Sequence, residues 1–169
     1  MSHAHSPVAV VRGRHDSAPV AESGPVVVGV DGSPASEPAI AAAFEEASSR
    51  GAPLVAVHAW YDSTCEDFSG TVRIIPRWEP VADDEERLLA RRLAGRQEKY
   101  PDVEVRRVLR RDRPRHALLE AAEKARLVVV GSRGRGGFTG MLLGSTGQAL
   151  VQHAGCPVLV VRPEVPVAE

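Results

Sequence analysis

The sequence predicts an α/β fold: a doubly wound, five-stranded parallel sheet in the order 3-2-1-4-5, with helices on both faces. Two observations predict it. Short apolar runs alternate along the chain with stretches of helical periodicity, which is the pattern of a parallel sheet joined by crossover helices. The 169 residues, 43% of them hydrophobic, also suit one domain with a substantial core. Because crossovers are right-handed, few other topologies remain.

The first unit shows each signal clearly. Residues 26–30 are a short β-branched run, typical of a strand that is buried on both faces. Ser33 is expected to cap the following helix and Pro34 to occupy its first position, while Gly51 ends it. The chain before this unit mixes His, Ser, Pro, Gly and Arg without a period, so residues 1–25 are expected to be a flexible tail.

The later units repeat the alternation of strand and helix. Apolar runs bounded by turn residues predict the remaining four strands at 53–60, 103–109, 127–132 and 157–162. Helical spacing predicts helices that begin at 83 or 84, at 112–114 and at 145. Residues 61–82 lack a period and are expected to form a long loop. The domain is thus expected over 26–163, with a short tail at 164–169, and no internal repeat is expected.

Charge and cysteine content exclude several classes of protein. The net charge of −1 gives no support to a nucleic-acid partner or a membrane-surface role. No apolar run approaches the roughly 18 residues of a membrane helix, and no signal peptide is visible. Cys65 and Cys156 are too few and too far apart for a zinc cluster, and we expect them to be free thiols in a cytoplasmic protein.

The turn after the fourth strand contains an unusual amount of glycine. Its pattern is Gly131-x2-Gly134-x9-Gly144-Ser145, which is neither a P-loop, nor a dinucleotide fingerprint, nor the turn of a serine hydrolase. Gly134 is expected to allow a positive φ angle. The N–H groups after Ser145 would form an anion site at a helix start, with Arg133 and Arg135 adding positive charge.

Ser145 has an alternative interpretation. Ser145-x-x-Gln148 has the spacing of a capping box, in which the serine would only cap its own helix. Asp31 has two interpretations as well. It follows the first strand at the same edge of the sheet, where a carboxylate could accept hydrogen bonds from ribose hydroxyls or hold a cation, or it could start a turn through Gly32. The convergence of Asp31 and the glycine turn on one edge favours a nucleotide.

These segments resemble the universal stress protein family over roughly residues 25–163. The resemblance rests on VVVGVDGS, on VAVHAW and above all on the glycine pattern, which is that family's ATP-binding signature. Asp112-Arg113-Pro114 stands where the family often has Gly-x-Pro. The resemblance implies that ATP is held by a set of ten residues, and that Asp31 can hold Mg²⁺ together with the nucleotide. These are Gly29, Val30, Asp31 and Ala59 toward the adenine and ribose, and Gly131, Arg133, Gly134, Gly144, Ser145 and Thr146 toward the ribose and phosphates.

The sequence therefore predicts an ATP-binding stress or regulatory protein that works as a nucleotide-sensing homodimer. The dimer is expected to form through residues 157–161, because this apolar strand is last in the sheet and would be an open edge. The alternative is a monomer in which residues 1–25 cover that edge. Three alternatives stay open: a slow Mg²⁺-dependent ATPase, a cyclic-AMP-binding protein, and an interaction module that binds no nucleotide. Little or no turnover is expected, because no general base accompanies the loop and a lone histidine such as His58 is more often structural.

Overall fold

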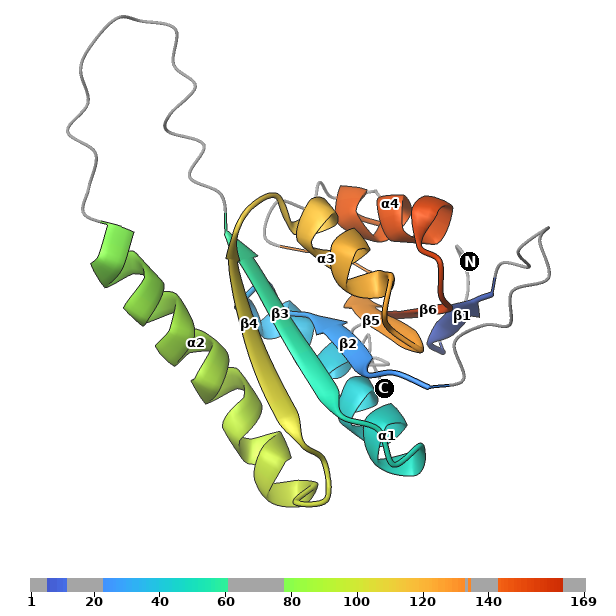
Figure 1. Cartoon of the computed structure of the whole chain (residues 1–169), viewed down its shortest axis with the longest axis horizontal. Helices are drawn as coiled ribbons and strands as arrows, with labels where there is room; N and C mark the ends of the chain where they lie inside the picture. The colour runs from blue at the N-terminus through green and yellow to red at the C-terminus, as the bar shows by residue number, and fades with distance from the viewer. Residues whose placement is uncertain (1–5, 12–22, 61–77, 133, 135–142, 163–169) are drawn as a thin grey trace, which may run out of the picture.

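A computed structural model describes residues 6–11, 23–60, 78–132, 134 and 143–162. They form a six-stranded sheet in the order β1-β6-β5-β2-β3-β4, in which every neighbouring pair is parallel except β1 and β6 (Figure 1). The strands are β1 (Val8–Val10), β2 (Val26–Gly29), β3 (Leu54–Trp60), β4 (Val105–Arg111), β5 (Leu127–Gly131) and β6 (Val158–Val161). The helices are the 3-10 turn η1 (Pro34–Ser36), α1 (Glu37–Ser49), α2 (Trp78–Lys99), α3 (Pro114–Ala122) and α4 (Ser145–His153).

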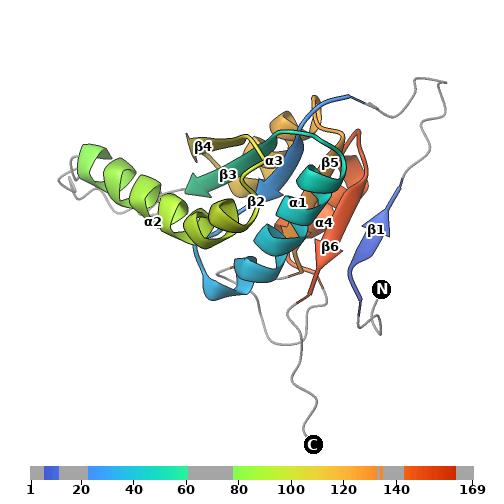
Figure 2. The same cartoon turned by 90° about the horizontal axis from the view of Figure 1, so that it is seen from below.

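Helices cover both faces of the sheet (Figure 2), and this explains the unbroken valine runs. Successive strand residues point to opposite faces, so a strand covered on both sides must be apolar at every position. Val26 and Val28 pack in one core cluster with α1 and α2, whereas Val27 packs in the other with α3 and α4. The largest fully buried side chain, Phe44, lies in the first cluster.

The predicted α/β class is confirmed, and the five parallel strands follow the predicted order 3-2-1-4-5. The sheet nevertheless has a sixth strand. Val8–Val10 lies within the segment that was expected to be a flexible tail, and it pairs with β6 in antiparallel register (Figure 2). The expectation that residues 157–161 form an open edge is therefore wrong for this structure, because β1 takes up the hydrogen-bonding edge of β6.

Two helix starts also differ from expectation. Ser33 precedes a short 3-10 turn rather than α1 itself, and its side chain makes no capping bond. α2 begins at Trp78, so residues 78–82 of the expected loop are helical, whereas residues 61–77 lie outside the described part of the chain. α2 is strongly charged, and no helix among the described residues is long and apolar enough to cross a membrane.

Candidate functional site

The carboxyl ends of β2, β3 and β5 meet at one edge of the sheet. The β2–β3 register pairs Gly29 with Val57, so Asp31 and Ala59 lie at the same level two residues further on. The β2–β5 register pairs Val28 with Val129, which places Ser132 at that level too. Because the order reverses between β2 and β5, this edge is the place where open α/β sheets hold ligands.

The Asp31 carboxylate uses only one of its two oxygens within the protein. Oδ1 accepts hydrogen bonds from the Ser33 backbone N–H at 2.9 Å and from the Ser33 hydroxyl at 2.7 Å. This is the turn through Gly32 that the sequence suggested, and Gly32 adopts a left-handed φ of 77°. Oδ2 is buried and has no hydrogen-bond partner in the described part of the chain. A buried carboxylate oxygen without a donor is costly, so Oδ2 is suited to a donor supplied by a ligand.

Gly134 faces this free oxygen. A β-carbon on Gly134 would stand 3.3 Å from Asp31 Oδ2, and no other heavy atom of the described residues, apart from its chain neighbours, would lie within 4 Å of it. The expectation of a positive φ at Gly134 is wrong, because the described glycines with positive φ are Gly24, Gly32 and Gly51. The glycine keeps space free in front of the carboxylate instead.

A backbone hydrogen bond closes the glycine loop at its base. The Gly144 N–H donates to the Ser132 carbonyl at 2.9 Å, and the Ser132 N–H donates to the Val161 carbonyl at 2.7 Å. Residue 144 is thereby held beside the end of β5, where α4 begins. Of the loop itself, Arg133 and Arg135 lie outside the described residues, so their predicted contribution stays a prediction.

The start of α4 offers free donors. Gly144 is the N-cap residue, so Ser145 is the first helical residue and no side chain caps this helix. The alternative capping-box interpretation of Ser145 is therefore wrong for this structure. The first intrahelical bond runs from the Gln148 N–H to the Gly144 carbonyl, at 2.9 Å, which leaves the N–H groups of Ser145, Thr146 and Gly147 without an intrahelical acceptor. No acidic residue occupies this first turn.

Two of the nearby glycines are explained by packing. A β-carbon on Gly29 would lie 2.9 Å from a methyl group of Leu118 on α3, and one on Gly147 would lie 2.6 Å from a methyl group of Leu143. Val30 is buried and its N–H donates to the Val57 carbonyl at 2.9 Å. The structure thus places Gly29 and Val30 under the edge as support for Asp31.

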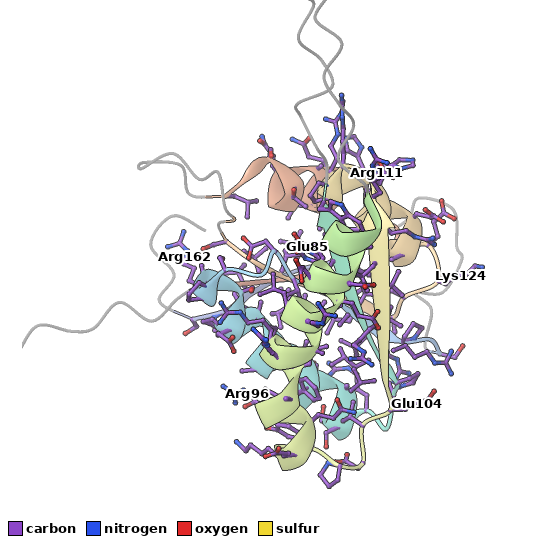
Figure 3. The ribbon with its side chains drawn as sticks, turned by 90° about the vertical axis from the view of Figure 1, so that its left-hand side faces the viewer. Glu85, Arg96, Glu104, Arg111, Lys124 and Arg162 are labelled. Atoms are coloured by element: carbon purple, nitrogen blue, oxygen red, sulfur yellow. The ribbon has the colours of Figure 1, made fainter. Side chains whose placement is uncertain are left out.

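His58 connects this edge to α2. It is 1% exposed, its Nδ1 lies 2.7 Å from the Val30 carbonyl oxygen, and its Nε2 lies 2.7 Å from Glu85 Oε2. Figure 3 shows Glu85 in the half of α2 that lies nearer to Arg111. Because a carbonyl can only accept, Nδ1 carries a proton in this arrangement. Both ring nitrogens are engaged inside the protein, which agrees with the structural interpretation of His58.

Arg92 is a second connection from α2, and sequence reasoning missed it. Its Nη2 and Nε donate to the Gly32 carbonyl at 3.0 and 3.2 Å, and its Nη1 donates to Glu37 Oε1 at 3.1 Å. The guanidinium therefore fixes the turn that carries Asp31. Nothing in the local sequence of α2 distinguishes Arg92 or Glu85 from the many other charged residues of that helix.

The acidic groups at this edge do not form a metal site by themselves. Among the described residues, no group of three or more His, Cys, Asp or Glu side chains is arranged to hold a metal ion. Asp31 Oδ2 is a single carboxylate oxygen, so it fits a Mg²⁺ ion that takes its remaining ligands from phosphate and water, as Mg²⁺ commonly does.

Comparison with known proteins gives a consistent family. The model of the universal stress protein family matches residues 23–162. A universal stress protein of Mycolicibacterium smegmatis is 52% identical over 163 residues, and one of Mycobacterium tuberculosis is 48% identical over 162 residues. Each alignment covers 96% of this chain and 53% of the relative, so the chain spans about half the length of these curated relatives.

Solved structures share the fold. The universal stress protein UspA from Lactobacillus plantarum has a TM-score of 0.64 at 24% identity and covers 82% of this chain and 97% of its own. A universal stress protein in complex with cAMP has a TM-score of 0.58 at 25% identity, over 83% of this chain and 98% of its own. One from Archaeoglobus fulgidus in complex with dAMP has a TM-score of 0.56 at 22% identity, over 82% and 98%.

Proposed function

Because this chain belongs to the universal stress protein family, we propose that it binds an adenine nucleotide, ATP, at the carboxyl edge of β2 and β5. The observation that carries this proposal is the unpartnered Asp31 Oδ2 beside Gly134. A ribose hydroxyl is a donor of suitable size for that oxygen. The N–H groups of residues 145–147 at the start of α4, which have no intrahelical acceptor, are hydrogen-bond donors. Together with the helix dipole they favour phosphate oxygens, which are acceptors.

The proposed contacts follow from these placements. The adenine lies toward Val30 and Ala59, above the support given by Gly29, and the ribose lies at Asp31. The phosphates lie along Gly131, Gly134 and the α4 start, with Arg133 as a cationic neighbour. Asp31 Oδ2 would be the protein atom that holds Mg²⁺ when it does not accept from the ribose, and the ion would supply positive charge beside the phosphates. The phosphate side of this assignment comprises Gly131, Arg133, Gly134, Gly144, Ser145 and Thr146.

Cyclic AMP is the second candidate ligand. It has the same adenine and ribose as ATP, and the neighbour in complex with cAMP is 25% identical to this chain. The two ligands differ in the number of phosphate oxygens that the start of α4 would have to bind, because ATP has two more phosphate groups than cyclic AMP. ATP is favoured here because the first turn of α4 is free of acidic residues and of side-chain caps.

The proposed biological role is regulatory. The chain would report nucleotide levels in the cytoplasm through its bound ATP, with little or no hydrolysis. A homodimer through residues 157–161 is part of this proposal, and it requires β1 to leave the edge of β6. Since the chain spans about half the length of its curated relatives, the role of a longer protein would include whatever its other half contributes.

Calorimetric titration with Mg·ATP tests the site. In Asp31→Asn, an amide can keep the contacts with Ser33 through its oxygen, but its NH₂ group replaces the free acceptor Oδ2. We expect at least a tenfold loss of affinity, which corresponds to about 1.4 kcal/mol. Asp102→Asn is the matched control, because Asp102 also accepts from a serine hydroxyl, that of Ser48, at 2.7 Å on an exposed surface away from the edge.

The outcomes separate the candidate ligands. Unchanged ATP affinity in a folded Asp31→Asn protein rules out the proposed placement of the ribose. A second titration series with cyclic AMP distinguishes the ligands, since tighter binding of cyclic AMP than of ATP moves the assignment to the second candidate. If neither nucleotide binds to the wild type, the remaining alternative is an interaction module that binds no nucleotide.

A further inference from the structure

The first strand repeats the sequence of the last one. Residues 2–12 read SHAHSPVAVVR and residues 152–162 read QHAGCPVLVVR. Seven of these eleven aligned positions are identical, including the proline that precedes each strand and the arginine that follows it. The expectation that the chain contains no internal repeat is therefore wrong. The repeat is short, and it coincides with the two strands that pair with each other.

The pairing of the two copies is self-complementary. Val8 is opposite Val160, Ala9 is opposite Leu159 and Val10 is opposite Val158. In the repeat, Val8 is equivalent to Val158 and Val10 to Val160. Exchanging the two strands therefore leaves the pairing unchanged, with Ala9 and Leu159 as its central pair. This is the register that two identical β6 strands would adopt about a two-fold axis, with Leu159 opposite its own copy.

β1 is held at this edge by few contacts. The ladder has three residue pairs, Ala9 is exposed, and Val8 and Val10 are only half-buried. Neither valine belongs to the two core clusters, whereas Val158 and Val160 are buried in one of them. The family model begins at residue 23 and so does not include β1, although the alignments with the curated relatives, which cover 96% of this chain, extend over it.

The two edges of the sheet are protected differently. The outward strand at the other edge, β4, exposes Arg106, Arg107, Arg110 and Arg111, and charged side chains on an edge discourage pairing with another chain. Figure 3 shows Arg111 at one end of this strand and Glu104 at the other. β6 has no charged residue between Val158 and Val161. Without β1, its unpaired edge is therefore open to another strand.

We propose that β1 is an internal substitute for the β6 strand of a second copy of this chain, and that the outer edge of β6 binds that second copy when β1 leaves. β1 is joined to β2 by only 15 residues, 11–25. A short connection within one chain gives a strand an effective concentration near the millimolar range, so at micromolar protein concentration β1 competes strongly and holds the chain as a monomer.

A second copy has one advantage over β1. At the central position it brings Leu159 where β1 has Ala9, and Leu159 already packs against the core cluster of α1 and α2. Two leucines directly opposite each other bury more apolar surface than a leucine opposite an alanine. This inference refines the homodimer of the proposed function and does not depend on nucleotide binding, so the titrations above and the test below can fail separately.

Sedimentation velocity on the full chain, over a micromolar concentration series without nucleotide, tests the inference. Ala9→Pro removes a strand N–H and blocks the ladder, and we expect it to convert a monomeric wild type into a dimer. Ala9→Ser keeps the backbone donor and is the matched control, which should remain monomeric. Ala9→Leu makes β1 more like β6 and should keep the chain monomeric at higher concentration than the wild type.

A disulfide identifies the interface. Leu159→Cys combined with Ala9→Pro should give, on mild oxidation, an intermolecular bridge that mass spectrometry maps to position 159 in both copies. Three results overturn the inference: an Ala9→Pro protein that has native circular dichroism but stays monomeric, equal dimerisation of the wild type and Ala9→Pro, or a dimer without the bridge at position 159. If Ala9→Pro fails to fold, a chain that lacks residues 1–11 replaces it.

Discussion

Asp31 and Gly134 face each other at the carboxyl edge of the sheet, with 3.3 Å between Asp31 Oδ2 and the point where a β-carbon would stand on Gly134. Asp31 follows β2 and Gly134 follows β5, the two neighbouring strands between which the strand order reverses. At this distance any side chain on residue 134 would occupy the space directly in front of the free carboxylate oxygen. The glycine is therefore required by the space in front of Asp31 Oδ2, and not by its own backbone conformation.

Gly134→Val should abolish most nucleotide binding. The added methyl groups fill the space before Asp31 Oδ2, so we expect the affinity for Mg·ATP to fall at least tenfold, while the unfolding free energy changes by less than about 0.5 kcal/mol because Gly134 is exposed. Calorimetric titration measures the affinity. Gly155→Val is the matched control, because Gly155 is also a turn glycine without positive φ and has open space around it. Equal affinities of the two variants would refute the role given to Gly134.

The parallel part of the sheet could be predicted because its signal is local. Residues 26–30 and 127–132 are apolar at successive positions, which only a strand covered on both faces requires, and the helical periods between the runs give the crossovers. β1 could not be predicted in this way. Three residues in a segment rich in His, Ser and Arg have no period of their own, and Val8–Val10 becomes a strand through its pairing with β6. The usable signal was the likeness of residues 2–12 to residues 152–162.

The same distinction applies to the site. Asp31 and Gly144 could be predicted because each lies next to a strand or helix terminus with a recognisable motif. Arg92 and Glu85 could not, because they act on partners 60 and 27 residues away. In sequence, both look like members of the exposed charged face of α2. Which of its charges turn toward the sheet depends on how α2 packs on it, and periodicity does not determine that in a helix with so many charged residues.

Hydrolysis of the bound nucleotide should be slow. The described residues at the edge provide one carboxylate, whose Oδ1 is already engaged by Ser33, and backbone N–H donors that bind phosphate without activating water. We expect phosphate release well below about 1 per second, the low end of ordinary enzymes. A coupled phosphate assay with saturating Mg·ATP measures it. A faster rate that Asp31→Asn abolishes would place the protein among the ATPases.

The pair of Asp112 and His116 should make stability depend on pH. The hydrogen bond and charge of Asp112 raise the pKa of His116 above its ordinary 6.5, and the hydrogen bond from His116 is the main cause that lowers the pKa of Asp112 below its ordinary 3.8. A raised histidine pKa stabilises the fold below pH 6.5, and this contribution is lost as the pH rises through the folded-state value. A lowered aspartate pKa stabilises the fold above pH 3.8 and is lost as the pH falls.

The two contributions therefore overlap between the two ordinary pKa values. His116→Ala should lower the urea midpoint most in that window, and the difference from the wild type should shrink at higher pH. His116 is exposed and Asp112 is only half-buried, so solvent screens the pair and we expect a small effect. Asp112→Ala, alone and combined with His116→Ala, completes a double-mutant cycle. The cycle separates the pair from the hydrogen bond that Asp112 accepts from the Arg113 N–H, and the coupling should be largest inside the window. A difference that is constant across the whole pH range would show that the pair does not titrate as described.

Loss of Glu85 should destabilise the fold, because it leaves a buried histidine nitrogen without a partner. His58 Nδ1 is held by the Val30 carbonyl, so among the described residues Nε2 has Glu85 as its one partner, and water cannot replace the carboxylate easily at a side chain that is 1% exposed. An unsatisfied buried polar group costs about 1–3 kcal/mol, and we expect Glu85→Ala to lower the unfolding free energy by that amount in urea titrations.

Glu86→Ala is the matched control on the exposed neighbouring position, where the change should stay within about 0.5 kcal/mol. Glu85→Gln should recover part of the loss, because its amide N–H can donate to a neutral Nε2. Equal unfolding free energies for Glu85→Ala and Glu86→Ala would mean that His58 does not depend on Glu85, and that α2 is held to the carboxyl edge by other contacts.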